Sequence, residues 1–96
     1  MKPSEVLDQN RELIRAVASR YRVANPRVFG SALHQNDRDG SDIDILVDLL
    51  PGASLFDLTG LQAELEKSLG VPVDIVTSTG LHWFIRDKVL AEAEPV

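Results

Sequence analysis

The 96-residue chain contains no cysteine, which excludes disulfide bonds, zinc–thiolate sites and thiol nucleophiles. The absence fits a reducing compartment. Long apolar runs are missing too, since none approaches the ~20 residues of a membrane-spanning helix. The segment from Met1 to Glu5 lacks the apolar core of a signal peptide. We therefore predict a cytoplasmic protein with no membrane segment.

Basic side chains are scarce, and the acidic ones are concentrated. The net charge is −5 at pH 7, and within residues 30–48 five aspartates oppose Arg38 alone, a local balance of −4. These aspartates are Asp37, Asp39, Asp42, Asp44 and Asp48. A chain without a basic stripe is a poor candidate for direct binding to DNA or RNA. The acidic window is either a solvated loop or a cation site, and the spacing of its aspartates decides between them.

The remaining composition is that of an ordinary globular protein. Apolar residues make up 44% of the chain and charged residues 26%, which excludes a disordered tail and a collagen-like chain. A chain of this length can bury one modest core. We expect a single domain over residues 1–96.

Hydrophobic periodicity and capping signals predict elements in the order α-β-β-α-β-α. The predicted helices cover residues 4–21, 54–70 and 81–93, and the predicted strands cover residues 27–29, 42–49 and 71–76. Ser4 and Ser54 are placed to cap the first two helices, and Gly70 is placed to end the second. Residues 31–41 predict a loop or a short helix. This order indicates an α+β protein with α/β-type layering, a small mixed sheet of three to four strands packed by helices.

Three acidic residues lie in segments that otherwise predict apolar strands. Because strand side chains alternate, Asp42 and Asp44 point to the same side, roughly 7 Å apart. Asp74 interrupts the apolar strand Val71–Val76. If these strands are neighbours, three carboxylates converge with no Lys or Arg nearby in sequence, and such oxygen clusters suit Mg²⁺ or Mn²⁺. The alternative is a solvated strand start, which is credible for Asp42 alone.

A second motif precedes the aspartates at a fixed spacing. Gly30 lets the backbone approach a ligand, and Ser31 can donate from both its hydroxyl and its amide. A Gly-Ser pair alone is a weak signal. The full pattern, Gly-Ser, ten residues, then Asp42-x-Asp44, is expected by chance in about one chain of this length per thousand.

This pattern resembles the motif of the DNA polymerase β nucleotidyltransferase superfamily, with Asp74 as the third carboxylate. The short chain is similar to the minimal nucleotidyltransferase (MNT) branch, antitoxins encoded beside HEPN-domain toxins. The resemblance implies a nucleotidyltransferase fold in which Gly30 and Ser31 bind the triphosphate of ATP. It also implies that Asp42, Asp44 and Asp74 are catalytic and hold two Mg²⁺ ions, or Mn²⁺, with Asp42 and Asp44 also binding the nucleotide through the metal.

One segment departs from the family pattern. Many members have Ala-Arg-Gly two residues after the Gly-Ser pair, where this chain has Leu33-His34-Gln35. A cation that contacts the phosphates is therefore missing, unless His34 is protonated or Arg38 takes its place.

The resemblance implies transfer of AMP from ATP to a hydroxyl group, a tyrosine of a cognate HEPN toxin, which silences the toxin. Two alternatives stay open. The chain could neutralise its toxin by binding alone, with a vestigial metal site, or it could be the catalytic half of a two-chain enzyme for a small-molecule acceptor. An assembly with the toxin is expected both if the chain modifies the toxin and if it neutralises the toxin by binding alone.

The last predicted helix carries a candidate partner surface. Ile85, Val89 and Ala93 form one stripe, which predicts core packing. Phe84 projects away from that stripe, which favours an interface, whereas Trp83 at its edge favours the core.

Overall fold

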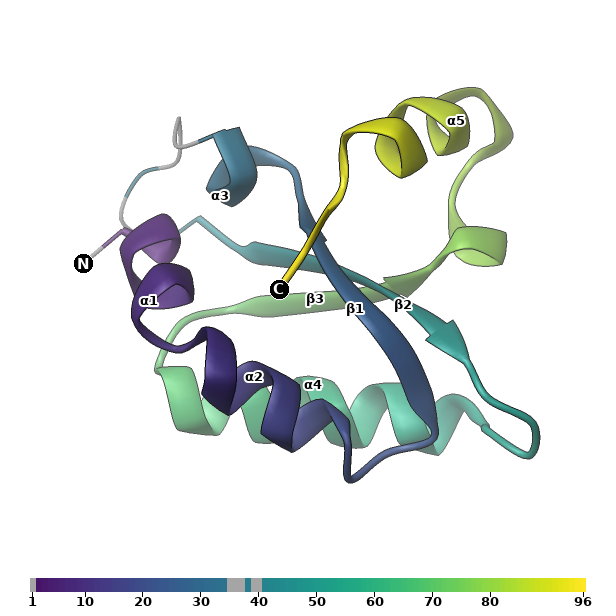
Figure 1. The fold of residues 1–96 in the computed structure, drawn as a ribbon, viewed down its shortest axis with the longest axis horizontal. Helices are drawn as coiled ribbons and strands as arrows, with labels where there is room; N and C mark the ends of the chain where they lie inside the picture. The colour runs from purple at the N-terminus through teal and green to yellow at the C-terminus, as the bar shows by residue number, and fades with distance from the viewer. Residues whose placement is uncertain (1, 35–37, 39–40) are drawn as a thin grey trace.

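The computed structural model describes residues 2–34, 38 and 41–96 (Figure 1). Within them the expected α+β class is confirmed, as a four-stranded mixed sheet with helices on both sides. The elements are α1 (Pro3–Gln9), α2 (Arg11–Ala18), β1 (Val23–Phe29), α3 (Ser31–His34), β2 (Ile43–Leu49), α4 (Leu55–Leu69), β3 (Val73–Thr77), the 3₁₀ helix η1 (Ser78–Gly80), α5 (Trp83–Glu92) and β4 (Glu94–Pro95). No helix among the described residues has both the length and the apolar character that a bilayer crossing requires.

The strands lie in the order β3-β2-β1-β4. β2 runs parallel to β3, and β1 runs antiparallel to both β2 and β4. Figure 1 shows α2 and α4 along one side of the sheet and α5 on the other. We call these sides the core face and the site face.

The core face carries the alternate apolar residues of β2 and β3, which pack against α1, α2 and α4. Its strand residues are Ile43, Ile45, Val47, Val73 and Ile75. Strand alternation turns the residues between them to the site face, which therefore receives Asp44, Leu46, Asp48 and Asp74. The core face therefore packs in the hydrophobic core, and the site face carries the acidic side chains.

The predicted first helix is wrong in one respect, because it is two helices. The backbone of Asn10 leaves the helical region at φ −129°, and its side-chain amide donates to the carbonyl of Val6 at 2.8 Å. An asparagine side chain that bonds to nearby backbone competes with the helical ladder, so the chain turns here. Ser4, expected as the N-cap, lies inside α1 and is buried.

β1 begins four residues earlier than predicted. The Asn25-Pro26 pair would normally interrupt a strand, but a bulge accommodates both residues, since the register with β2 shifts between Ala24 and Arg27. Asn25 has φ 53°, and Pro26 has no N–H to give to a ladder.

α4 ends and begins where its signals predict. The N–H of Ser54 donates to the Asp57 carboxylate at 2.9 Å, and the Ser54 hydroxyl accepts from the N–H of Phe56. Gly70 has φ 73°, the left-handed conformation that ends many helices. Side chains of α4 also reach the outer edge of β3, where Glu66 accepts from the N–H of Val73 and Gln62 from the N–H of Ile75.

The C-terminal segment corrects two expectations. Residues 94–96 follow the last predicted element but contain β4, and the N–H of Val96 donates to the carbonyl of Pro26 at 3.1 Å. The stripe of Ile85, Val89 and Ala93 is not part of the core, because α5 has no buried residue. Trp83, expected in the core, is 75% exposed.

Candidate active site

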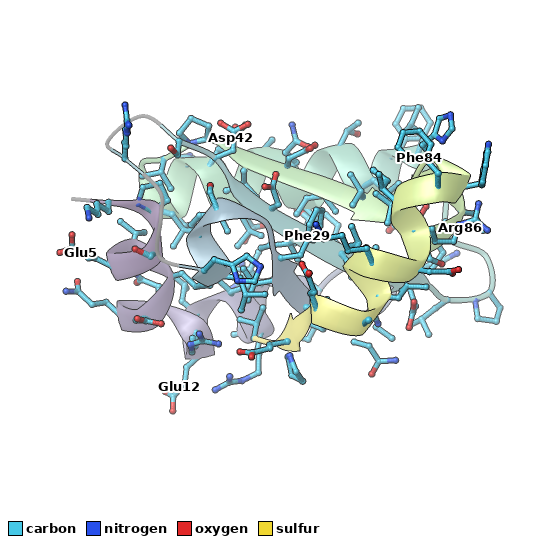
Figure 2. All side chains as sticks on the ribbon, turned by 90° about the horizontal axis from the view of Figure 1, so that it is seen from above. Glu5, Glu12, Phe29, Asp42, Phe84 and Arg86 are labelled. Carbon is cyan, nitrogen blue, oxygen red and sulfur yellow. The ribbon has the colours of Figure 1, made fainter. Side chains whose placement is uncertain are left out.

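The two aspartate strands are neighbours, and their register brings the carboxylates together. β2 pairs in parallel with β3 so that Asp44 lies directly opposite Asp74. Asp42 precedes β2 and is exposed, like Asp74, whereas Asp44 is half-buried. Figure 2 looks onto the site face, with Asp42 at the start of β2. The structure thus places all three predicted aspartates at one end of this face.

The electrostatics of this cluster are unfavourable without a cation. Burial, together with the charges of Asp74 and Asp42, raises the pKa of Asp44 to about 6. None of the ion pairs between described residues involves any of the three. The negative charge therefore has no compensation from the described part of the chain.

This donor set fits a divalent cation of the Mg²⁺ type, which prefers carboxylate oxygens. In the described residues no three ligating side chains are gathered closely enough to hold an ion as they stand. The three aspartates therefore concentrate negative charge in one region but do not form a preformed metal site. Two of its members are exposed and free to change rotamer, so an ion could draw the carboxylates around itself.

A fourth aspartate on the site face shows the opposite environment. Arg27 donates to both carboxylate oxygens of Asp48 at 3.1 Å, and Asn25 donates to one of them at 3.0 Å. These hydrogen bonds lower the pKa of Asp48. Asp48 is neutralised locally, so the uncompensated charge of the site face lies at the other end of β2.

Gly30 joins the Gly-Ser pair to the carboxylates. A Cβ at Gly30 would lie 2.4 Å from Oδ2 of Asp44, and the φ of +77° is one that side-chain-bearing residues rarely adopt. No other residue fits this position without displacing the carboxylate. Ser31 follows at the start of α3, so the Gly-Ser turn and the metal-binding candidates meet at one point.

A pocket of about 460 Å³ opens beside this turn, between α3 and α5. Its lining residues are Phe29, Gly30, Ser31, His34, Ile85, Lys88, Val89 and Glu92. The four residues of α5 escaped the sequence prediction. Their helical spacing (85, 88, 89 and 92) was the available signal, but such a stripe normally indicates core packing, and only the tertiary arrangement shows that it faces a pocket.

The segment that departs from the family pattern is described only in part. His34 lies on the pocket wall, with Nε2 3.4 Å from Oε2 of Glu92. Gln35 is outside the described residues. Arg38, the other expected substitute for the missing cation, is exposed and is not among the residues that line the pocket.

Comparison with known proteins decides the family. A family model described as a nucleotidyltransferase domain matches residues 10–96, most of the chain. The chain belongs to the nucleotidyltransferase domain family. This nucleotidyltransferase is 42% identical, over 74 residues, to a protein of Methanocaldococcus jannaschii that is named as a candidate protein adenylyltransferase. That match covers 77% of this chain and 80% of the archaeal protein.

Solved structures agree with the family. A candidate minimal nucleotidyltransferase is 40% identical and superposes with a TM-score of 0.86, covering 97% of this nucleotidyltransferase and 95% of its own chain. A toxin–antitoxin structure with AMP-PNP superposes with a TM-score of 0.76 over 90% of this chain and 71% of that one. At 20% identity the second likeness shows the shared fold alone. The nucleotidyltransferase fold expected from the motif is confirmed.

Proposed function

We propose that this nucleotidyltransferase transfers AMP from ATP to a hydroxyl group of a partner protein, and that it acts as an antitoxin whose partner is a HEPN-type toxin. One observation carries the proposal. Gly30, which lines the pocket, lies so close to Asp44 that an added Cβ would be 2.4 Å from the carboxylate, and Asp44 lies opposite Asp74. A phosphate-binding turn and a metal-binding cluster therefore meet where an α-phosphate could lie between them. The archaeal relative named for protein adenylylation supports the choice of reaction.

The residues of the chain divide the work of the transfer. Asp42, Asp44 and Asp74 would hold two Mg²⁺ ions, which lower the pKa of the acceptor hydroxyl and neutralise charge on the leaving group when bound. Gly30 and Ser31 orient the triphosphate. The acceptor oxygen bonds to the α-phosphorus, the bond to the bridging oxygen breaks, and pyrophosphate leaves. Asp74, an exposed member of the cluster, accepts the hydroxyl proton.

The acceptor is proposed to be a protein because the site is open. Asp42 and Asp74 are exposed, so a hydroxyl on a second protein can approach them. The AMP-PNP-bound toxin–antitoxin structure with the same fold supports both ATP and a toxin as partners. A reaction that consumes ATP also agrees with the cytoplasmic location predicted from the sequence.

The test is a labelling reaction with Mg²⁺, α-labelled ATP and the protein that co-purifies with this chain. We expect label on the partner, abolished by Asp42→Ala and by Asp44→Ala but not by Glu12→Gln, an exposed acid on α2. Toxin neutralisation that survives both aspartate substitutions would contradict the enzyme and support a binding antitoxin. Label only on a small metabolite would support a two-chain enzyme.

Nucleotide binding tests the metal separately. ATP carries about four negative charges at neutral pH, so the bare aspartate cluster repels it, and Mg²⁺ reverses the sign of the site. Calorimetry should therefore show far weaker ATP binding in EDTA than in Mg²⁺, and equal affinities would contradict the metal assignment. Asp74→Asn should lose transfer but keep part of the ATP binding, because Asp42 and Asp44 remain.

A further inference from the structure

The pocket wall formed by α5 carries one cation, Lys88. We propose that the Lys88 ammonium anchors the triphosphate of the nucleotide, which supplies from α5 the phosphate-contacting cation that the segment after Ser31 lacks. This inference rests on the proposed function, since it names a further substrate-binding residue for the same site.

The charge balance of the pocket leaves Lys88 available. His34 and Glu92, the other titratable residues of the lining, lie 3.4 Å from each other across the gap between α3 and α5. Among the described residues, no ion pair or hydrogen bond engages the Lys88 side chain. The nearby arginines differ, because Arg27 is bound to Asp48 and Arg86 donates to the carbonyl of Leu81.

The position of Lys88 complements that of the aspartates. Gly30 lies close enough to Asp44 that an added Cβ would meet its carboxylate, and it also lines the pocket, whose wall includes residues of α5. A triphosphate that passes over the Gly30-Ser31 turn therefore has the carboxylate cluster on one flank and Lys88 on the other. Metal ions would neutralise the first flank, and the lysine supplies positive charge to the second. Its flexible four-carbon stem suits a point contact with phosphate oxygens.

The two substitutes expected from the sequence are less well placed. His34 is on the wall but faces Glu92, and Arg38 is not on the wall. Lys88 is far from the Gly-Ser pair along the chain, and only the packing of α5 over the site face brings it there.

The experiment measures binding of ATP, ADP, AMP and inorganic tripolyphosphate in Mg²⁺ by calorimetry. A charge-assisted hydrogen bond predicts that Lys88→Ala weakens ATP and tripolyphosphate about ten- to a hundredfold. AMP, which lacks the outer phosphates, should change much less. Lys88→Arg should restore most of the ATP affinity. Lys67→Ala, an exposed lysine on α4, serves as the matched control and should change nothing.

The outcomes separate this inference from the proposed function. Equal losses for ATP and AMP would show that Lys88 only shapes the wall, and no loss for any ligand would show that it does not reach the phosphates; either result overturns the inference. Lys88-dependent ATP binding without any transfer would contradict the proposed function and leave the inference standing. A wild-type chain that binds neither ATP nor tripolyphosphate would overturn both.

Discussion

The two faces of the sheet use the same strands for opposite purposes. On β2 the odd-numbered residues Ile43, Ile45 and Val47 are buried in the core, while Asp44 and Asp48 at even positions face the other side. The core face is stabilised by removing apolar area from water. The site face holds like charges next to each other, an arrangement that costs free energy until a ligand compensates it. Adjacent residues thus contribute with opposite sign to the stability of the fold.

The largest effect that tests this difference is expected at Asp44. Asp44→Asn should lower transfer by about a thousandfold or more, because it removes a charge of the proposed metal site, where charge develops in the reaction. The same change should stabilise the metal-free protein near pH 7. Parallel measurements of label transfer and of melting in EDTA check both halves.

The pH dependence of folding stability is an independent test of whether the charge of Asp44 destabilises the fold. The Asp44 pKa is about 6 in the folded chain against 3.8 for an unperturbed aspartate, so the folded state binds this proton more tightly. Its contribution to stability is therefore present below pH 3.8 and is lost as the pH rises through about 6. Asp44→Asn should remove that part of the curve. If the variant is less stable than the wild type at pH 7 in EDTA, the charge cluster is not a source of strain.

The neighbouring core residue should behave in the reverse way. Ile45→Ala should cost about 2–5 kcal/mol of unfolding free energy, because it leaves a cavity beneath the sheet. Urea titration measures the loss. Leu49→Ala, at an exposed position on the same strand, is the control and should cost far less. Equal losses at the two positions would contradict the assignment of the faces.

An apolar residue outside the core should affect binding and not folding. Phe84 is 65% exposed, and its ring lies 4.4 Å from that of His82, centroid to centroid. Phe84→Ala should weaken partner binding by about 1–3 kcal/mol with little change in melting temperature. Phe56→Ala, another exposed phenylalanine at the start of α4, serves as the control. A steep fall in the melting temperature of Phe84→Ala would show that this ring stabilises the fold and is not a binding residue.

The smallest effect is expected for the compensated aspartate of the site face. Asp48→Asn removes a two-bond contact with Arg27 that is partly exposed, so it should cost no more than about 1 kcal/mol. Because the folded-state pKa of Asp48 is lowered, this contribution is present above the pKa of an unfolded aspartate and is lost as the pH falls through the folded value. A denaturation series from pH 7 to acid measures it. A larger loss than at Ile45 would contradict the ranking of the two faces.

Patterns of neighbouring residues predicted most of the helices and strands. The features that they did not predict depend on the conformation of single residues or on packing between distant segments. The sequence predicted the cap of α4 at Ser54 and its end at Gly70. It also predicted the two strands that carry Asp44 and Asp74, because the signals for each element lie in adjacent residues. The break at Asn10 and the bulge at Asn25 were hidden because each depends on a single backbone conformation.

The α5 side of the pocket could not be predicted for a different reason. A stripe such as Ile85 and Val89 has the same spacing whether it meets a core or a ligand space. Only the placement of the helix over Gly30 distinguishes the two, and that placement comes from contacts distant in sequence. The sequence does not distinguish Lys88 from other surface lysines, because its place on the pocket wall depends on the same long-range packing.

The hydrogen bonds from Glu66 and Gln62 to the outer amides of β3 bear on how this chain meets other chains. An edge strand with free amides can recruit a further strand and start aggregation. Here two of those donors are already engaged, and the opposite edge is the two-residue β4, which contains Pro95 and so offers few amides. The sheet is therefore protected against growth at both ends. A protein partner of the kind proposed above would therefore have to recognise side chains on the surface of the chain and not the edge of its sheet.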